Sequence, residues 1–130
     1  MKKRYKVLIV LFVILAIIGS GFAYLINKSQ REFDIMMAQE IEPLDLLGVS
    51  DGVYRGEYFA FPIGVIVNVT IENHLITKIE LVKHTNGQGE PAEIITDDVV
   101  ARQSLDIDLI SGASYSSKVI LLAIDDAFKN

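Results

Sequence analysis

The chain has 130 residues, enough for one small domain and its attachments. Residues 1–26 hold four of the 12 basic residues and none of the 17 acidic ones, so residues 27–130 carry a net charge of −9, which argues against nucleic acid and anionic lipid as partners of that part. The absence of cysteine excludes a disulfide framework, thiolate chemistry and iron–sulfur sites.

The N-terminal segment has the pattern of a membrane anchor. Residues 7–26 form a run of 20 residues without a charge, which as a helix would be about 30 Å long, the thickness of the hydrocarbon core. Basic residues at positions 2–6 precede this run, and such residues stay on the cytoplasmic side. We therefore expect residues 1–26 to be a single-pass anchor in the cell membrane, with the C-terminal domain extracytoplasmic. A cleaved signal peptide is the alternative, because residues 19–23 are mostly small.

Residues 27–47 have the composition of a stalk. Phe33, Met36 and Ile41 show loose helical spacing among charged residues. This segment either continues the membrane helix outward until Pro43 interrupts it, or packs on the domain as an N-terminal helix. The folded domain is then expected to span residues 48–130.

An antiparallel meander is predicted for residues 51–83. Asp51-Gly52 is a turn signal, and β-forming residues follow it. Residues 63–71 alternate apolar side chains with period two, which predicts a strand with one buried face. Residues 72–74 then predict a hairpin turn, since asparagine tolerates a left-handed backbone, and residues 75–82 predict the return strand.

Two helices are predicted after the meander. Pro91 suits the first turn of a helix that runs toward Gln103, and residues 104–110 predict a short strand or an extended segment. The last helix is expected to start near Ser116 or Ser117, with apolar residues at helical spacing: Ile120, Leu121, Ala123, Ile124, Ala127 and Phe128. The predicted fold class is α+β, an N-terminal transmembrane helix followed by a small antiparallel sheet packed by two helices.

The segment Ser111-Gly112-Ala113-Ser114-Tyr115-Ser116-Ser117 stands directly before the apolar stretch of the last helix. Backbone N–H groups at a helix start carry partial positive charge and bind phosphate, glycine permits close approach, and a serine hydroxyl can hydrogen-bond a phosphate or be esterified by it. The alternative is an ordinary helix cap, for which serine is a favoured residue.

The chain has two histidines, and their spacing predicts no metal site. His74 falls in the predicted hairpin turn, where we expect it to be solvated. His84 ends the return strand and begins a polar loop that contains Gly87 and Gly89. It is expected either to approach the serine segment in space or to be a solvated loop residue.

The chain carries a series of signals in a fixed order: Asp51-Gly52-Val53-Tyr54-Arg55-Gly56, the valine-rich hairpin, His84 with Gly87-x-Gly89, Ala92-Glu93, Gln103-Ser104-Leu105-Asp106-Ile107-Asp108, and the serine segment followed by Lys118. This order resembles the FMN-binding domain family. That family includes the flavin-carrying subunits of sodium-pumping NADH:quinone oxidoreductase and of the Rnf complex, and many small membrane-anchored proteins. The resemblance covers residues 48–130.

The resemblance implies a cofactor and a mode of attachment. Family members commonly carry FMN joined through its phosphate to a threonine after Ser/Thr-Gly-Ala, a bond made by a separate flavin transferase. Ser111, Gly112 and Ala113 match this motif, Asp108 matches the acidic residue before it, and Ser114 stands at the acceptor position. The expected cofactor-binding residues are Ser111, Gly112, Ala113, Ser114, Tyr115, Ser116, Ser117 and His84, with Tyr115, Phe59 or Phe61 stacking on the flavin ring or lying in the core.

The resemblance also predicts a function. We expect a membrane-anchored, extracytoplasmic flavoprotein that relays electrons, with FMN supplying the redox chemistry. Its expected partners are the membrane, a flavin transferase, and a membrane-bound or extracytoplasmic redox partner. No catalytic residues are predicted, so electron transfer rather than a stand-alone enzymatic reaction is expected. The alternative function is a flavin-free interaction module of a membrane complex.

Overall fold

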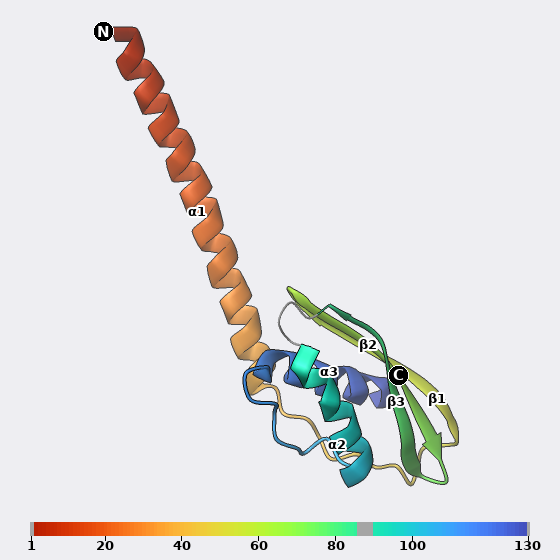
Figure 1. Cartoon of the computed structure of the whole chain (residues 1–130). Helices are drawn as coiled ribbons and strands as arrows, with labels where there is room; N and C mark the ends of the chain where they lie inside the picture. Colours follow the sequence, from red (N-terminus) through yellow and green to blue (C-terminus); the bar gives the residue numbers. More distant parts are fainter. Residues whose placement is uncertain (1, 86–89, 130) are drawn as a thin grey trace. The chain divides into compact units, whose positions relative to one another are not determined.

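The computed structural model describes residues 2–85 and 90–129. The chain forms two compact units, residues 1–34 and residues 35–130. Along the chain a long helix comes first, then three strands, and then a 3₁₀ helix and two α-helices, as Figure 1 shows. This order confirms the predicted α+β class.

The first unit is a single helix. Helix α1 (Lys2–Ala38) begins in it and has exposed side chains throughout residues 2–28. It is long and apolar enough to cross a membrane, by length and composition. A signal sequence near an N-terminus meets the same criteria of length and composition.

The second unit starts within the last turn of α1. Met36 is buried there at 1% exposure, and Gln39 donates its backbone N–H to Met36 O at 3.1 Å as the helix ends. The helix therefore stops well before Pro43. Residues 39–51 continue without helix or strand and are hydrogen-bonded to the domain. Gln39, for example, accepts from Tyr58 Oη at 3.2 Å and from Lys118 Nζ at 2.6 Å.

Three antiparallel strands form the sheet in the order β1 (Gly52–Ala60), β2 (Ile63–Glu72), β3 (Leu75–Thr85). Asn73 and His74 form the β2–β3 turn with φ of 52° and 63°, the left-handed conformation that a two-residue hairpin turn requires. The predicted meander and its turn are therefore confirmed. The pairing shifts register between residues 66 and 67 and again between 70 and 71.

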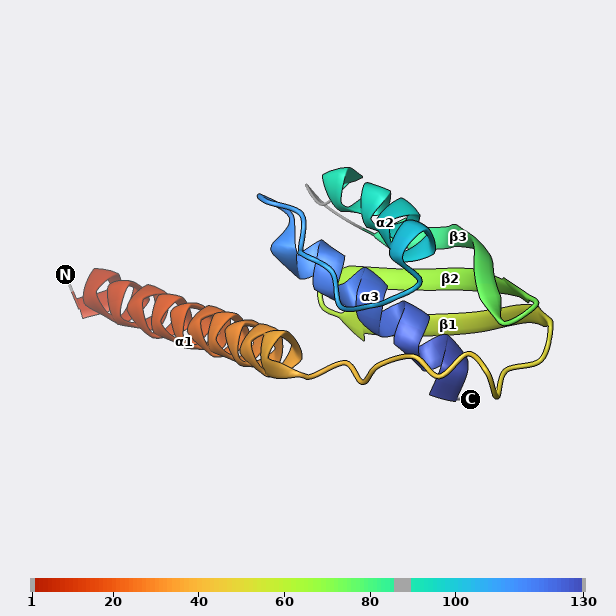
Figure 2. The same cartoon turned by 90° about the horizontal axis from the view of Figure 1, so that it is seen from below.

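The sheet has one buried and one exposed face, because side chains alternate along each strand. The alternating apolar residues of β2 are buried on the inner face, as predicted: Ile63, Val65, Val67, Val69 and Ile71. Helix α3 (Ser114–Lys129) packs over β1 and β2 on this face, and α2 (Ile95–Arg102) lies over β3 (Figure 2). The outer face carries no helix in the described part of the second unit.

Helix α3 runs antiparallel to β1. Phe128 near its end stacks beside Tyr54 near the start of β1, with ring centroids 6.0 Å apart. Lys118 near its start shares Gln39 with Tyr58 near the end of β1. The start of α3 and the ends of β1 and β3 therefore lie at the same end of the domain (Figures 1 and 2).

Helix α3 meets β1 at very short range. A Cβ atom at Gly56 would overlap Ala123 O and would lie 2.6 Å from Ala127 N. The backbone N–H of Glu57 donates to Asp126 Oδ2 at 2.9 Å along the free edge of β1. The contact therefore depends on the absence of a side chain at position 56.

Residues 90–102 are helical, and one glutamine fixes the end of this segment. The 3₁₀ helix η1 (Glu90–Ile94) leads into α2, which ends at Gln103 in a left-handed conformation. The Gln103 side chain accepts from Ile76 N at 2.7 Å and donates to Ile76 O at 2.8 Å, so it pairs with the outer edge of β3 as a strand would. The predicted helix toward Gln103 is confirmed.

Of the two alternatives predicted for residues 104–110, a short strand or an extended segment, the strand is not formed: these residues pair with none of the described strands and lead into the turn before α3. One predicted detail changes. The last helix starts at Ser114 rather than near Ser116 or Ser117, because the Ser117 hydroxyl holds the preceding turn from inside the helix instead of capping it from outside. The predicted buried face of this helix is confirmed, with Phe128 half-buried.

Candidate functional site

A tight turn leads into α3. Ala113 donates its N–H to Ile110 O at 3.0 Å, and Gly112 has φ of +79°, in the left-handed region that favours glycine. Apart from its two chain neighbours, no described residue has an atom within 4 Å of a Cβ built on Gly112. The position is thus open on its outer side, and the constraint on it is conformational rather than steric.

The Ser117 hydroxyl holds this turn against the helix. It donates to Ala113 O at 2.8 Å and accepts from Ile110 N at 3.0 Å, and the residue is completely buried. The Ser117 N–H also donates to Ala113 O, at 2.9 Å. Both polar groups of Ser117 are therefore used inside the protein, and its contribution to the site is to shape it.

The backbone hydrogen bonds of α3 begin with the one from Ser117 N–H to Ala113 O. The backbone N–H groups of residues 114–116 lie before this first helical hydrogen bond. Ser111, Gly112, Ser114 and Tyr115 are exposed, whereas Ala113 and Ser116 are buried. The Ser114 hydroxyl thus stands at the open mouth of the helix, where the helix dipole favours an anion.

His84 is buried near the same end of the domain. It lies across the sheet from Val65 and Tyr58, in a row on the inner face. Its side chain is 3% exposed, and its Nδ1 lies 2.9 Å from Oε1 of Glu93 in η1. Its Nε2 is buried and has no hydrogen-bond partner. His84 is therefore not a solvated loop residue.

The sequence did not predict the pairing of His84 with Glu93. The two residues are nine positions apart on different elements, so no helical or strand period connects them. His74, by contrast, is exposed in the hairpin turn as expected, and its Nδ1 lies 3.1 Å from Leu46 O. In residues 2–85 and 90–129, no group of three histidine or acidic side chains is arranged to hold a metal ion.

The three aromatic candidates for flavin stacking are exposed and do not form part of the core. Tyr115 is 47%, Phe61 62% and Phe59 69% exposed. Phe59 lies on the outer face of the sheet, opposite α3, and Phe61 lies in the β1–β2 turn, with the two rings 6.5 Å apart. The structure therefore places Tyr115 alone within the serine segment and does not bring Phe59 to it.

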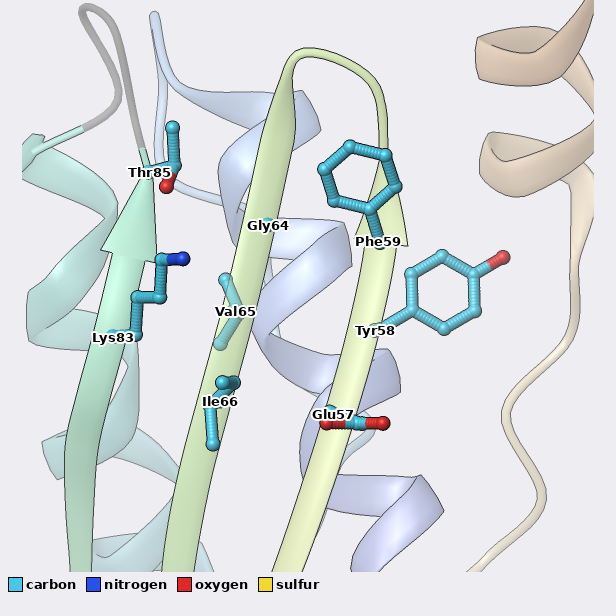
Figure 3. A pocket seen from close by; sticks show the side chains of 8 residues that line it. All are labelled: Glu57, Tyr58, Phe59, Gly64, Val65, Ile66, Lys83 and Thr85. Atoms are coloured by element: carbon cyan, nitrogen blue, oxygen red, sulfur yellow. The ribbon is translucent and has the colours of Figure 1, made fainter.

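The outer face has a shallow hollow of about 430 Å³. Phe59 stands on one side of it and Lys83 and Thr85 on the other, with Gly64 between them (Figure 3). A Cβ at Gly64 would lie 2.9 Å from Phe59 Cδ2, so the ring lies directly beside the glycine. Gly87 and Gly89, which the sequence placed in the following loop, lie outside the described residues.

Comparison with known proteins identifies the family. The family model for the FMN-binding domain matches residues 59–129, more than half of the chain, and this region includes His84 and the whole serine segment. No curated protein and no solved structure matches the chain. The chain therefore belongs to the FMN-binding domain family, and FMN is its cofactor.

Proposed function

We propose that the start of α3 holds the phosphate of FMN and that Ser114 Oγ is its covalent attachment point. The observation that carries this proposal is the exposed Ser114 hydroxyl at the first position of α3, directly after the open turn at Gly112. The N–H groups of residues 114–116 suit the phosphate oxygens. The residues present fit the cofactor, since the buried Nε2 of His84, at the same end of the domain, lacks a partner that a ligand can supply.

The attachment is a transfer reaction that needs an activated donor. Ser114 Oγ attacks the FMN phosphorus of a flavin dinucleotide bound by a flavin transferase. The Oγ–P bond forms as the phosphoanhydride P–O bond breaks, the nucleoside monophosphate leaves, and the serine proton passes to the transferase. No base for this step is assigned to the chain itself, and the exposure of Ser114 leaves it accessible to a second enzyme.

The same proposal includes electron relay at a membrane. Bound FMN supplies the redox chemistry, and the chain supplies binding and position. The length and composition of α1 suit a membrane anchor, and the basic flank at positions 2–6 favours an extracytoplasmic domain. Such a domain would exchange electrons with a membrane-bound or extracytoplasmic partner. The flavin-free interaction module has less support, because the family match includes the proposed FMN site.

The test is to produce the full chain together with a flavin transferase and to measure its intact mass. The wild-type chain should gain one FMN less one water, and its band should fluoresce under ultraviolet light after denaturation. Ser114→Ala should abolish both signals. Ser50→Ala is the control, because Ser50 is an exposed serine outside the serine segment, so this variant should keep the label. An unlabelled, colourless wild-type chain would rule out the proposal.

A further inference from the structure

The buried pair of His84 and Glu93 defines the protonation of the imidazole. An ionised carboxylate accepts hydrogen bonds and donates none, so the 2.9 Å contact requires the hydrogen to be on His84 Nδ1. In the neutral imidazole the other nitrogen, Nε2, then has only a lone pair to offer. Glu93 thereby turns Nε2 into a hydrogen-bond acceptor.

That acceptor is buried without a partner. The His84 side chain is 3% exposed, and Nε2 is the one buried side-chain nitrogen or oxygen without a hydrogen bond in the described part of the chain. A buried polar atom without a partner is unfavourable and is rare in native proteins. A missing partner is therefore expected, and for the neutral imidazole it is a hydrogen-bond donor.

The position of the pair connects it with the serine segment. Glu93 belongs to η1, and η1 packs against α3. His84 lies level with Tyr58, which shares Gln39 with Lys118, one turn beyond Ser114. Figure 1 shows the end of β3, η1 and the start of α3 at one end of the second unit.

We infer that His84 Nε2 accepts a hydrogen bond from an O–H or N–H donor of bound FMN, and that Glu93 is a positioning residue that fixes the required tautomer. The inference rests on the proposed function. The FMN phosphate has acceptor oxygens and suits the helix start, whereas the ribityl hydroxyls and the ring N–H are donors and suit Nε2. The helix start therefore suits the hydrogen-bond acceptors of FMN, and His84 Nε2 suits its hydrogen-bond donors.

The test uses histidine labelled with ¹⁵N in the full chain. The sequence has two histidines, so the spectrum shows only His84 and the exposed His74, which is the internal control. The chain without FMN should show His84 as the Nδ1–H tautomer. In the chain loaded by co-expression with the transferase, the Nε2 resonance of His84 should move to lower frequency, with both nitrogens of His74 unchanged.

A matched pair of variants tests the role of Glu93. Glu93→Ala removes the acceptor of Nδ1, so the His84 signals should become those of mixed tautomers. Glu90→Ala changes an exposed acidic residue of the same 3₁₀ helix and should leave the Nδ1–H form intact. Circular dichroism of both variants shows whether the fold is kept.

The outcomes separate this inference from the proposed function. A chain that carries FMN but shows an unmoved His84 Nε2 overturns the inference and leaves the proposed function standing. A Glu93→Ala chain that is folded and retains a pure Nδ1–H tautomer overturns the role of Glu93. A chain that takes up no FMN overturns both.

Discussion

The two halves of α3 differ in what their polar and backbone groups do. In the C-terminal half, Ala123 and Ala127 approach Gly56 closely, and Asp126 accepts the N–H of Glu57. In the N-terminal turn, Ser114 and Tyr115 are exposed. The backbone N–H groups of residues 114–116 lie before the first helical hydrogen bond. The C-terminal half of the helix is thus occupied by contacts within the protein, whereas the N-terminal turn leaves the Ser114 side chain exposed.

This difference gives a general rule for the domain. Residues that contact the sheet should control stability, because their loss creates overlaps or unsatisfied groups. Residues at the open mouth should control FMN and leave stability unchanged. Ser117 belongs to both groups of residues, since it is in the first turn of α3 but its hydroxyl and N–H are hydrogen-bonded inside the protein.

The largest expected loss of stability is at the contact of the C-terminal half of α3 with β1. Gly56→Ala puts a Cβ into Ala123 O, a backbone atom that cannot move aside, so the free energy of unfolding should fall by about 3 kcal/mol. Gly64→Ala is the control, because its Cβ meets only the exposed Phe59 ring, and we expect a loss below about 1 kcal/mol. Urea unfolding followed by circular dichroism measures both. Equal losses would contradict the close contact of α3 with β1.

A smaller loss of stability is expected at Ser117. Ser117→Ala removes the bond to Ala113 O and leaves the N–H of Ile110 without its acceptor, so stability should fall by about 1–3 kcal/mol. The turn before α3 should loosen, and flavin attachment should decrease with it. Urea unfolding and the fluorescence of the denatured band are the two measurements. Unchanged values in both would show that Ser117 does not shape the turn.

At the open mouth, Ser114→Thr should leave the free energy of unfolding within about 0.5 kcal/mol of wild type, because the side chain is exposed. Threonine is the usual acceptor in the family, and its methyl group restricts the rotamer of the oxygen. The labelled fraction under limiting transferase should therefore rise. Intact mass measures that fraction, and a fall would mean that the transferase recognises serine specifically in this chain.

The smallest effect is electrostatic and lies at the end of α3. The hydrogen bond to Asp125 at 2.6 Å and the charge of that carboxylate raise the pKa of Lys129 above its usual 10.5, with smaller contributions from Glu42 and Asp126. A pKa raised on folding adds stability that is fully present below the unfolded value and is lost as pH rises through the folded one.

The wild-type chain should therefore lose slightly more stability than Lys129→Gln when the pH rises above 10.5. Lys129 is exposed, so solvent screening keeps the difference small. Thermal unfolding below and above that pH measures it. Identical losses in both chains would show that the ion pair contributes nothing in solution.

Much of the fold could be predicted from the sequence, because it depends on local periodicity. The alternating valines predicted β2 and its buried face, and the turn at Asn73 and His74 followed from the left-handed tolerance of asparagine. The buried face of α3 followed from helical spacing. Each of these signals is contained in a short stretch of chain.

The rest depends on contacts between distant residues. Helix α3 starts two or three residues before the predicted start, because Ser117 acts from within the first turn and does not cap the helix from outside. The pairing of His84 with Glu93 required the end of β3 to meet η1, and Gln103 met Ile76 across 27 positions. None of these pairs leaves a period in the sequence.

The side chains of Gln103 and Asp126 have a consequence for behaviour at high concentration. Gln103 occupies the N–H and C=O of Ile76 on the outer edge of β3, and Asp126 occupies the N–H of Glu57 on the outer edge of β1. Each edge strand of the sheet therefore has one position at which it cannot pair with a strand of another molecule. Copies of the domain at high concentration should then collide without joining into intermolecular sheets.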